Sequence, residues 1–270
     1  MSASEGDTLP VSKWIAVPDL SYRAIRVWQR NCDTYLRLWK TELWPPFVEP
    51  VMYLLAFGVG LGLYVTGIGG QSYIEFIAPG ILAQSAMFAA CFECTYGSFI
   101  RMEHQKTFDA IIATPVSIED VVAGEILWGA SRGLLSSFAI LVVISVMGLV
   151  EWPAAILTLP FAALAAFMFA SISMLITAVV PSISSFNYFF TLALTPMFLV
   201  SGVFFPLDGL PPVFQQLAWL SPLTHVVIPV RAAASGHLYW GLLWNLAFVG
   251  ILGAVAFYIS LGRMSRRLVK

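Results

Sequence analysis

Charged residues are scarce in this chain of 270 residues. Asp, Glu, Lys and Arg make up 11% of the sequence, whereas hydrophobic residues make up 59%. A soluble domain of average composition would be about 25% charged. There are too few charges here to cover a water-facing surface, so lipid must cover much of the protein. The net charge of −1 gives no basis for nucleic-acid binding.

Several signatures of chemistry and processing are also missing. Three cysteines, two of them inside an apolar segment, do not fit a secreted disulfide scaffold. No Gly-x-x-x-x-Gly-Lys-Ser/Thr phosphate loop occurs, so the chain has no ATP-binding motif of its own. The three histidines are scattered, and no two of them have a metal-ligand spacing. The polar N-terminal stretch does not resemble a cleaved signal peptide.

Long apolar runs dominate the remainder of the sequence. A helix needs about 20 apolar residues to cross a hydrocarbon layer of roughly 30 Å. The runs of sufficient length are Pro46–Val65, Ile74–Phe99, Ile126–Val150, Ala154–Val180, Ile183–Phe205 and Gly241–Gly262. None shows the alternating pattern of an outer-membrane barrel, and lipid offers no partner for open backbone groups. The sequence therefore predicts an all-α membrane protein with six transmembrane helices in one domain, residues 1–270.

The basic residues predict the orientation of these spans. Six of the fourteen Lys and Arg precede the first span, and four close the chain after the last one. Three more lie in or just after the loop between spans two and three, which leaves only Arg231 on the opposite side. By the positive-inside rule, the basic side is the cytosol. Both termini are therefore expected to be cytosolic.

The segment before the last span allows two interpretations. Val213–Val230 could be a seventh span, but it contains two Gln, two Pro and a His and would place the Arg-rich C-terminus outside. We prefer two short helices that dip into the outer leaflet and break at Ser221-Pro222. Residues 206–238 would then form an external re-entrant hairpin. It could be a gate across an exit, or a plug that keeps the bundle closed to ions.

Residues 20–44 precede the first span and show two helical faces. Trp, Leu and Ile recur at spacings of three and four on one face, and four arginines keep the same rhythm on the opposite face. A basic face opposite Trp and Leu is typical of a helix that lies in the membrane interface. This interfacial amphipathic helix could be a simple anchor, or a collar that also contacts a cytosolic partner.

A polar island, Arg101–Asp120, interrupts the apolar runs. Within it, Gln105–Ile112 can form two helical turns that present Phe108 and other apolar side chains on one side. The following Thr-Pro pair, ending at Pro115, stops this helix. Such a cytosolic helix can dock into a groove of another protein. It can equally rest on lipid headgroups, and the residues alone leave both roles open.

The island also resembles a known family. The run that begins Arg101-Met-Glu-x-Gln-Lys-Thr-Phe-Asp-Ala-Ile and continues through Thr-Pro-Val-Ser-x-Glu-Asp to Trp128 is similar to the membrane subunits of type-2 ABC exporters. The similarity is to the NodJ-like branch, which is associated with lipo-oligosaccharide export, and covers most of the chain. In that family the first cytosolic loop is a coupling helix seated in the ATP-binding subunit. The implied contact residues are Arg101, Glu103, Lys106, Phe108, Asp109, Ile112 and Pro115.

The resemblance implies the function and the partners. The chain would be the permease subunit of an exporter that moves an amphipathic cargo such as a lipid-linked oligosaccharide. It would hold no cofactor itself, because ATP and Mg would be bound by two copies of a separate ATP-binding subunit. Two copies of this chain would form a homodimer with twelve spans around a central path. A multidrug or small-molecule exporter on the same scaffold is the alternative.

Spans one and five border the path in such exporters, which makes the aromatic residues on them candidates for its lining. These candidates are Tyr53, Phe57, Tyr188, Phe189, Phe190 and Phe198. An ionisable residue inside a span is costly and indicates a function. Glu93, in span two, either faces a wet pathway or is neutral and hydrogen-bonded to a neighbouring helix. An aromatic face suits sugar rings and acyl chains alike, so the cargo stays open.

Glu125 and Arg132 are seven residues apart, two turns along one helix face. The spacing suits an intrahelical ion pair, with gating as a further role. Two other classes of protein are less favoured by the charges. An intramembrane enzyme needs converging catalytic groups, but no histidine lies in a span. A proton-driven carrier would need more than one deep carboxylate, and Glu93 is the only one.

Overall fold

The computed structural model describes residues 20–42, 44, 48, 51–65, 68 and 70–268. Helices and their connections make up these ranges, which contain no β-strand and only an isolated bridge between Ile68 and Gln71. The predicted all-helical class is therefore confirmed. Of the first predicted span, residues 46–47, 49 and 50 lie outside the described residues, as does Pro45.

The described helices are short at the two ends of the bundle and long within it. The α-helices are α1 (Arg23–Arg37), α2 (Trp39–Glu42), α4 (Tyr73–Phe92), α5 (Thr107–Ile112), α6 (Ile118–Val146), α7 (Thr158–Val179), α8 (Phe186–Tyr188), α9 (Thr195–Val200), α10 (Pro212–Leu220), α11 (Thr224–Ala234) and α12 (Leu242–Leu268). The π-helical segments are Leu54–Gly60, Glu93–Gly97, Ile100–His104 and Phe189–Leu194. The 3-10 segments are Leu61–Leu63, Ala154–Leu157, Ile183–Ser185 and Leu207–Gly209.

Within the described residues, five continuous helical stretches are long and apolar enough to cross a membrane. They are Tyr73–His104, Ile118–Val146, Ala154–Val179, Ile183–Val200 and Leu242–Leu268. Helices α10 and α11 meet at 89°, and this bent pair would be a sixth span if it crosses. The described part of the first predicted span is a shorter apolar helix, Val51–Leu63.

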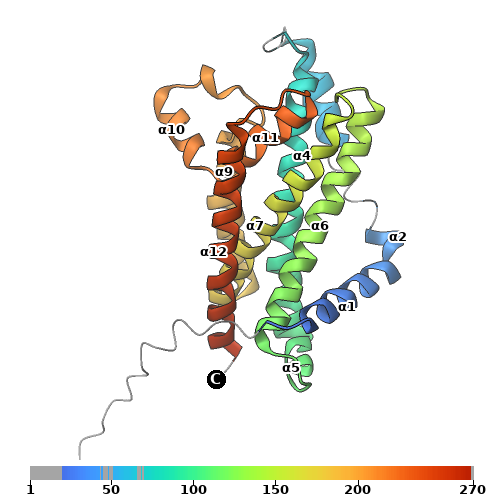
Figure 1. The fold of residues 1–270 in the computed structure, drawn as a ribbon, viewed down its shortest axis with the longest axis vertical. Coiled ribbons are helices and arrows are strands. Elements are labelled where there is room, and N and C mark those ends of the chain that lie inside the picture. The colour runs from blue at the N-terminus through green and yellow to red at the C-terminus, as the bar shows by residue number, and fades with distance from the viewer. Residues whose placement is uncertain are drawn as a thin grey trace, which may run out of the picture.

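Helix α6 stands at the centre of the bundle because its glycines allow neighbouring helices to approach closely. A Cβ atom on Gly133 would lie 2.6 Å from the Cβ of Ala166 on α7 and 2.7 Å from the carbonyl of Ala86 on α4. A Cβ on Gly124 would lie 2.6 Å from Val27 on α1. Small residues at helix crossings are the usual means of close packing in membranes. In Figure 1, α4, α6, α7 and α12 run along the long axis of the molecule.

Helix α1 lies against the side of α6 at the end of the bundle where α5 and the end of α12 lie (Figure 1). Its contact face is Ala24, Val27 and Asn31, which are buried. The apolar stripe predicted for membrane contact is mostly outside this contact: Ile25 is 50% exposed and Leu36 is 64% exposed. The helix therefore has a packed face and, beside it, a face left for lipid.

Candidate functional site

The polar island folds as a short helix between two long ones, at the end of the bundle that we call the α5 end. The helical stretch that begins at α4 continues to His104, and Lys106 then adopts a left-handed conformation with φ of 52°. This break reverses the chain into α5. The Ser117 side chain accepts a hydrogen bond of 3.1 Å from the Asp120 amide and caps the start of α6.

The structure corrects the interpretation of Phe108. Its side chain is fully buried in the hydrophobic core of the chain itself, so it is not available as a surface contact for a partner. The physical reason is that a helix of under two turns cannot hold a large ring in water when its own bundle is adjacent. Phe108 instead fixes α5 to the bundle.

The other predicted coupling residues divide between surface and interior. Lys106, Asp109 and Pro115 are exposed, and Ile112 is half-buried. Glu103 accepts a hydrogen bond of 2.9 Å from the Nη2 atom of Arg267 at the end of α12 and lies 3.5 Å from the Lys106 ammonium. The face that α5 offers to a partner is therefore polar and charged.

The N-terminal helix is tied to the same island. The hydroxyl of Ser21 donates to an Asp120 carboxylate oxygen at 2.7 Å, and the Ser21 amide donates to the other oxygen at 2.7 Å. The guanidinium of Arg23 donates to the carbonyl of Pro115. The collar predicted around residues 20–44 thus contacts the island of its own chain.

Arg101, the remaining predicted coupling residue, points into the bundle and pairs with Glu125 of α6. The Glu125 side chain is fully buried and accepts bonds from Arg101 Nη2 at 2.5 Å and Nε at 3.0 Å. Its other donors are the Ser98 hydroxyl at 2.7 Å and the Asn31 amide of α1 at 2.9 Å. Every lone-pair direction of this carboxylate is engaged, which is what a buried charge requires.

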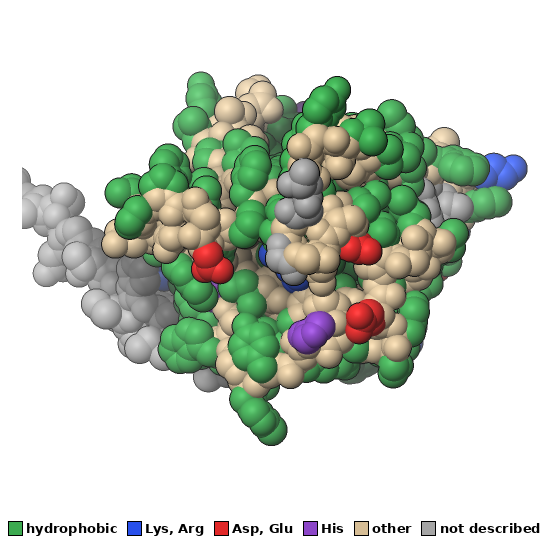
Figure 2. All heavy atoms as spheres, turned by 90° about the horizontal axis from the view of Figure 1, so that it is seen from above, with side chains coloured by type: hydrophobic (Ala, Val, Ile, Leu, Met, Phe, Trp, Pro, Cys, Tyr) green, Lys and Arg blue, Asp and Glu red, His purple; other side chains and the backbone are tan. Residues whose placement is uncertain are grey.

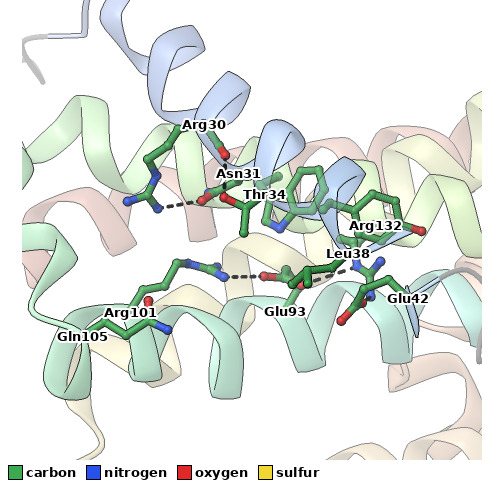
Figure 3. A pocket seen from close by; sticks show the side chains of 11 residues that line it. Arg30, Asn31, Thr34, Leu38, Glu42, Glu93, Arg101, Gln105 and Arg132 are labelled. Carbon is green, nitrogen blue, oxygen red and sulfur yellow. Dashed lines mark hydrogen bonds and ion pairs between the residues drawn. The ribbon is translucent and has the colours of Figure 1, made fainter. Parts of the chain in front are cut away.

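Glu93 extends this network toward the N-terminal helices. It lies 2.8 Å from Arg101 Nη1 and 3.5 Å from Arg132 Nε. Arg132 in turn pairs with Glu42 of α2 at 2.8 Å. Together with Arg30, which lies 3.7 Å from Glu125, these residues form what we call the charge cluster: Arg30, Glu42, Glu93, Arg101, Glu125 and Arg132. Figure 3 shows most of them around a common cavity.

The cluster corrects one expectation and bears on a second. Glu125 and Arg132 do not pair with each other, because seven residues of helix separate them by about 10 Å along the axis; each pairs with another helix instead. Glu93 is expected from the sequence either to face a wet pathway or to be neutral and hydrogen-bonded to a neighbouring helix. In the structure it is an ion-paired residue in the wall of a cavity of about 290 Å³ between α1, α6 and the end of the α4 stretch.

Arg30 and Glu42 are the two members of the cluster with the most exposed side chains, at 36% and 40%. Arg30 also has an atom without a hydrogen-bond partner in the described part of the chain. Its Nη2 atom donates to Asn31 at 2.7 Å, while its Nε atom is buried and has no hydrogen-bond partner among the described residues. Burial lowers the pKa of Arg30, and the Glu125 carboxylate opposes part of that shift. Arginine nevertheless stays charged near neutral pH.

A second feature joins the first, second and fifth predicted spans. Neighbouring aromatic rings lie 4.5–6.4 Å apart between centroids and form a continuous row that we call the aromatic ladder. In order, its rings are Tyr53, Phe57, Phe204, Phe198, Phe88, Phe190, Phe92, Tyr96, Phe186 and Phe99.

The ladder contains four of the six aromatic residues predicted to line a path: Tyr53, Phe57, Phe190 and Phe198. Phe189 packs beside it, 5.7 Å from Phe190, whereas Tyr188 is 70% exposed. The rings of the second span were missed. A signal was present, because Phe88, Phe92 and Tyr96 recur at spacings of four on one helix face.

Of the five long helical stretches among the described residues, the one in the fifth predicted span is the least covered by its own chain. Only 17% of its most apolar window, within Ile183–Val200, is buried, against 72% for Tyr73–His104. Tyr188, Leu192 and Leu199 are among its exposed side chains. This face needs a covering of lipid or of another protein chain.

At the opposite end of the bundle, the α11 end, the charges are arranged differently. The Nη2 atom of Arg231 donates to the carbonyl of Gly202 at 2.8 Å, and its guanidinium lies 3.9 Å from the Phe76 ring centroid. Its Nε atom is buried without a hydrogen-bond partner among the described residues. Glu75 and Glu151 line the same cavity of about 230 Å³. Figure 2 shows this end hollowed, with acidic side chains around it and a basic one deeper.

Comparisons with known proteins give one family. Residues 23–235 match the model of the ABC-2 type transporter. The chain is 37% identical to Nodulation protein J of Rhizobium leguminosarum bv. trifolii and 35% identical to Nodulation protein J of Sinorhizobium fredii, over 94% of this chain and 97% of each relative. It is 27% identical to the inner membrane transport permease YadH of Escherichia coli, over 76% of this chain and 80% of the relative.

Proposed function

The chain belongs to the ABC-2 type transporter family, and from that membership we propose that it is the permease subunit of an ATP-driven exporter of amphipathic molecules. Proteins of this family are membrane-embedded transport components and not enzymes in themselves, and the family implies an ATP-binding cassette partner. ATP and Mg would accordingly be bound by that partner, in two copies. The chain would be a multi-pass protein of a bacterial inner membrane with both termini in the cytosol.

The observation that carries the proposal is the construction of the α5 end. A short helix with exposed Lys106 and Asp109 stands at the tip between two long spans and is anchored by the buried Phe108. An anchored helix with a charged outer face suits docking into a groove of another protein. We assign α5 as the coupling helix, with contact through Lys106, Asp109 and Pro115 and support from Ile112.

The charge cluster supports a mechanism for passing on the movement of α5. Arg101 lies just before α5 and forms ion pairs with Glu93 in the same helical stretch and with Glu125 in α6. Glu103 forms an ion pair with Arg267 of α12. A displacement of α5 would therefore move the α4 stretch and α6 together, because breaking the buried pairs of Arg101 is costly, and the partly exposed Glu103–Arg267 pair links the end of α12 to the same movement.

The path is proposed to run along spans one and five of two facing copies. The uncovered face of Ile183–Val200 supports a homodimer there, and the aromatic ladder lies behind that face. π-Helical segments often mark functional sites, and three of the four among the described residues fall in the first, second and fifth predicted spans; the fourth, Ile100–His104, follows the second span. The bent pair α10–α11 is proposed as the re-entrant gate at the outer end.

The proposed cargo is a lipid-linked oligosaccharide or similar glycolipid. The identity of 35–37% to proteins named Nodulation protein J supports the branch that the sequence resembles, and aromatic faces suit both sugars and acyl chains. The alternative is efflux of drugs or other small molecules on the same scaffold. It is favoured only by the weaker likeness, 27%, to a protein named simply as a transport permease.

ATP turnover in vesicles distinguishes the two cargoes. The chain is reconstituted with its ATP-binding partner, and ATP hydrolysis is measured with added glycolipid extract from the host or with a panel of hydrophobic drugs. We expect the glycolipid extract to stimulate turnover and to be moved across the bilayer only with ATP. Stimulation by the drugs alone would favour the alternative, and no stimulation by either would contradict export of amphipathic cargo.

A further inference from the structure

Helix α1 separates two cavities of opposite character at the α5 end. The first, which we call the apolar groove, has a volume of about 580 Å³ and an almost wholly apolar lining. Among its walls are Trp28, Leu36, Trp128, Leu135, Phe138 and Ala163, contributed by α1, α6 and α7. The second is the cavity of the charge cluster.

The apolar groove runs along α6, within the third predicted span. Its α6 wall extends from Trp128 to Phe138, a rise of about 15 Å, which is about half of the hydrocarbon thickness. Water inside it would find almost no hydrogen-bond partner, so the groove excludes water. In a bilayer the groove would therefore be filled by hydrocarbon. Its length is about the depth of the hydrocarbon of one leaflet, so an acyl chain can lie along it.

The charged cavity offers one partly exposed cation and one partly exposed carboxylate. Arg101 and Arg132 each pair with two carboxylates, whereas Arg30 lies 3.7 Å from Glu125 and its side chain is 36% exposed. The Glu42 carboxylate is 40% exposed. A ligand that matches this wall carries an anionic group for Arg30 and a cationic group for Glu42. A purely anionic headgroup would be repelled by Glu42 and Glu93.

The two cavities share a wall. Tyr35 and Trp128 line both of them, and their rings meet edge to face with centroids 5.6 Å apart. One molecule can thus place a headgroup on one side of this ring pair and a chain on the other. The required ligand is amphipathic, with a zwitterionic head.

We propose that the two cavities together bind one zwitterionic phospholipid of the surrounding leaflet. Its phosphate lies at Arg30, its ammonium group at Glu42, and one acyl chain in the apolar groove. The ligand is assigned as a bilayer lipid and not the cargo because the apolar groove is lined by α1, α6 and the start of α7, none of which contributes a ring to the aromatic ladder. This inference is independent of the cargo and of ATP.

The test is the lipid that stays with the purified protein. The full tagged chain is extracted in mild detergent, washed with excess detergent, and examined by native mass spectrometry and lipid analysis. We expect one phosphatidylethanolamine-type lipid per chain. Leu135→Trp, which fills the groove at a position 43% exposed, should lower the retained lipid about tenfold, equivalent to roughly 1.4 kcal/mol. Val255→Trp, at a position 49% exposed on α12, is the matched control and should retain it.

The headgroup site has its own pair of variants. Arg30→Gln should also lower retention about tenfold, whereas Arg26→Gln, on the exposed side of α1, should not. Equal retention in all four variants, or equal loss with both tryptophan variants, would overturn the proposal. Retention of a mainly anionic lipid would overturn the headgroup assignment, and retention of the exported glycolipid would overturn the assignment to the bilayer. None of these outcomes depends on whether the protein exports anything.

Discussion

The two ends of this bundle handle buried charge in different ways. At the α5 end, three arginines and three glutamates form a cluster in which Glu125, fully buried, accepts from three neighbouring side chains. At the α11 end, Arg231 has no ion pair among the described residues and is held by the carbonyl of Gly202 and the ring of Phe76. The first arrangement ties several helices together, and the second rests on one side chain.

This difference implies that the α5 end is rigid and that the contact of Arg231 at the α11 end can break more easily. Removing one partner of a buried ion pair costs about 3–5 kcal/mol, because the other charge is left buried alone. A hydrogen bond to a charged group contributes only about 1.5–3 kcal/mol. The α5 end is therefore expected to move as a unit, while the contact between α11 and the end of α9 can open at lower cost.

The largest effect is expected from removing the central carboxylate of the cluster. Glu125→Leu leaves Arg101 without its main partner and should lower the free energy of unfolding by about 3–5 kcal/mol, measured by thermal unfolding in detergent. The double variant Glu125→Leu/Arg101→Met removes both charges and should recover most of the loss. Without that recovery, the rigidity of the α5 end would have to come from packing and not from ion pairing.

Phe108→Ala should have the next largest effect. It should lower the free energy of unfolding by about 3 kcal/mol, because it opens a cavity in the core. The matched control is Phe214→Ala on α10, where the ring is 48% exposed and the loss should stay within about 0.5 kcal/mol. Thermal unfolding of the two variants gives the comparison. An unchanged stability for Phe108→Ala together with loss of a partner would restore the surface-contact interpretation that the structure corrects.

Arg231→Met should have a smaller effect and lower the free energy of unfolding by at most about 1.5 kcal/mol. It leaves the Gly202 carbonyl without its donor but also removes a charge that no carboxylate pairs. The same unfolding assay measures it. A loss as large as that of Glu125→Leu would abolish the distinction between the two ends.

Asp109→Arg is expected to have the smallest effect on stability, within about 0.5 kcal/mol, because the side chain is exposed and makes no ion pair among the described residues. Its unfolding temperature should match that of the native chain. A larger change would mean that the outer face of α5 is part of the fold and cannot be left free for a partner.

Hydropathy and charge spacing predicted the all-helical class and located the polar island, because both depend on local composition. The ion-pair partner of a given charged residue does not depend on local composition. Glu125 and Arg132 share a helix face in the sequence, yet each pairs across helices, since the nearest opposite charge is set by packing against α2 and the α4 stretch. Phe108 shows the same limit: its apolar face was evident, but whether that face meets the core or a partner is decided only by the fold.

The most direct measurement is purification of the tagged chain from its native host in mild detergent, with mass spectrometry of the proteins that accompany it. Two matched variants, Asp109→Arg on α5 and Asp208→Arg at the other end of the bundle, change the same charge at exposed positions. We predict a stoichiometric partner with a phosphate-binding loop, retained by the native chain and by Asp208→Arg and lost from Asp109→Arg. A chain that purifies intact without such a partner, or that loses it equally with both variants, would contradict the assignment of α5 as the coupling helix.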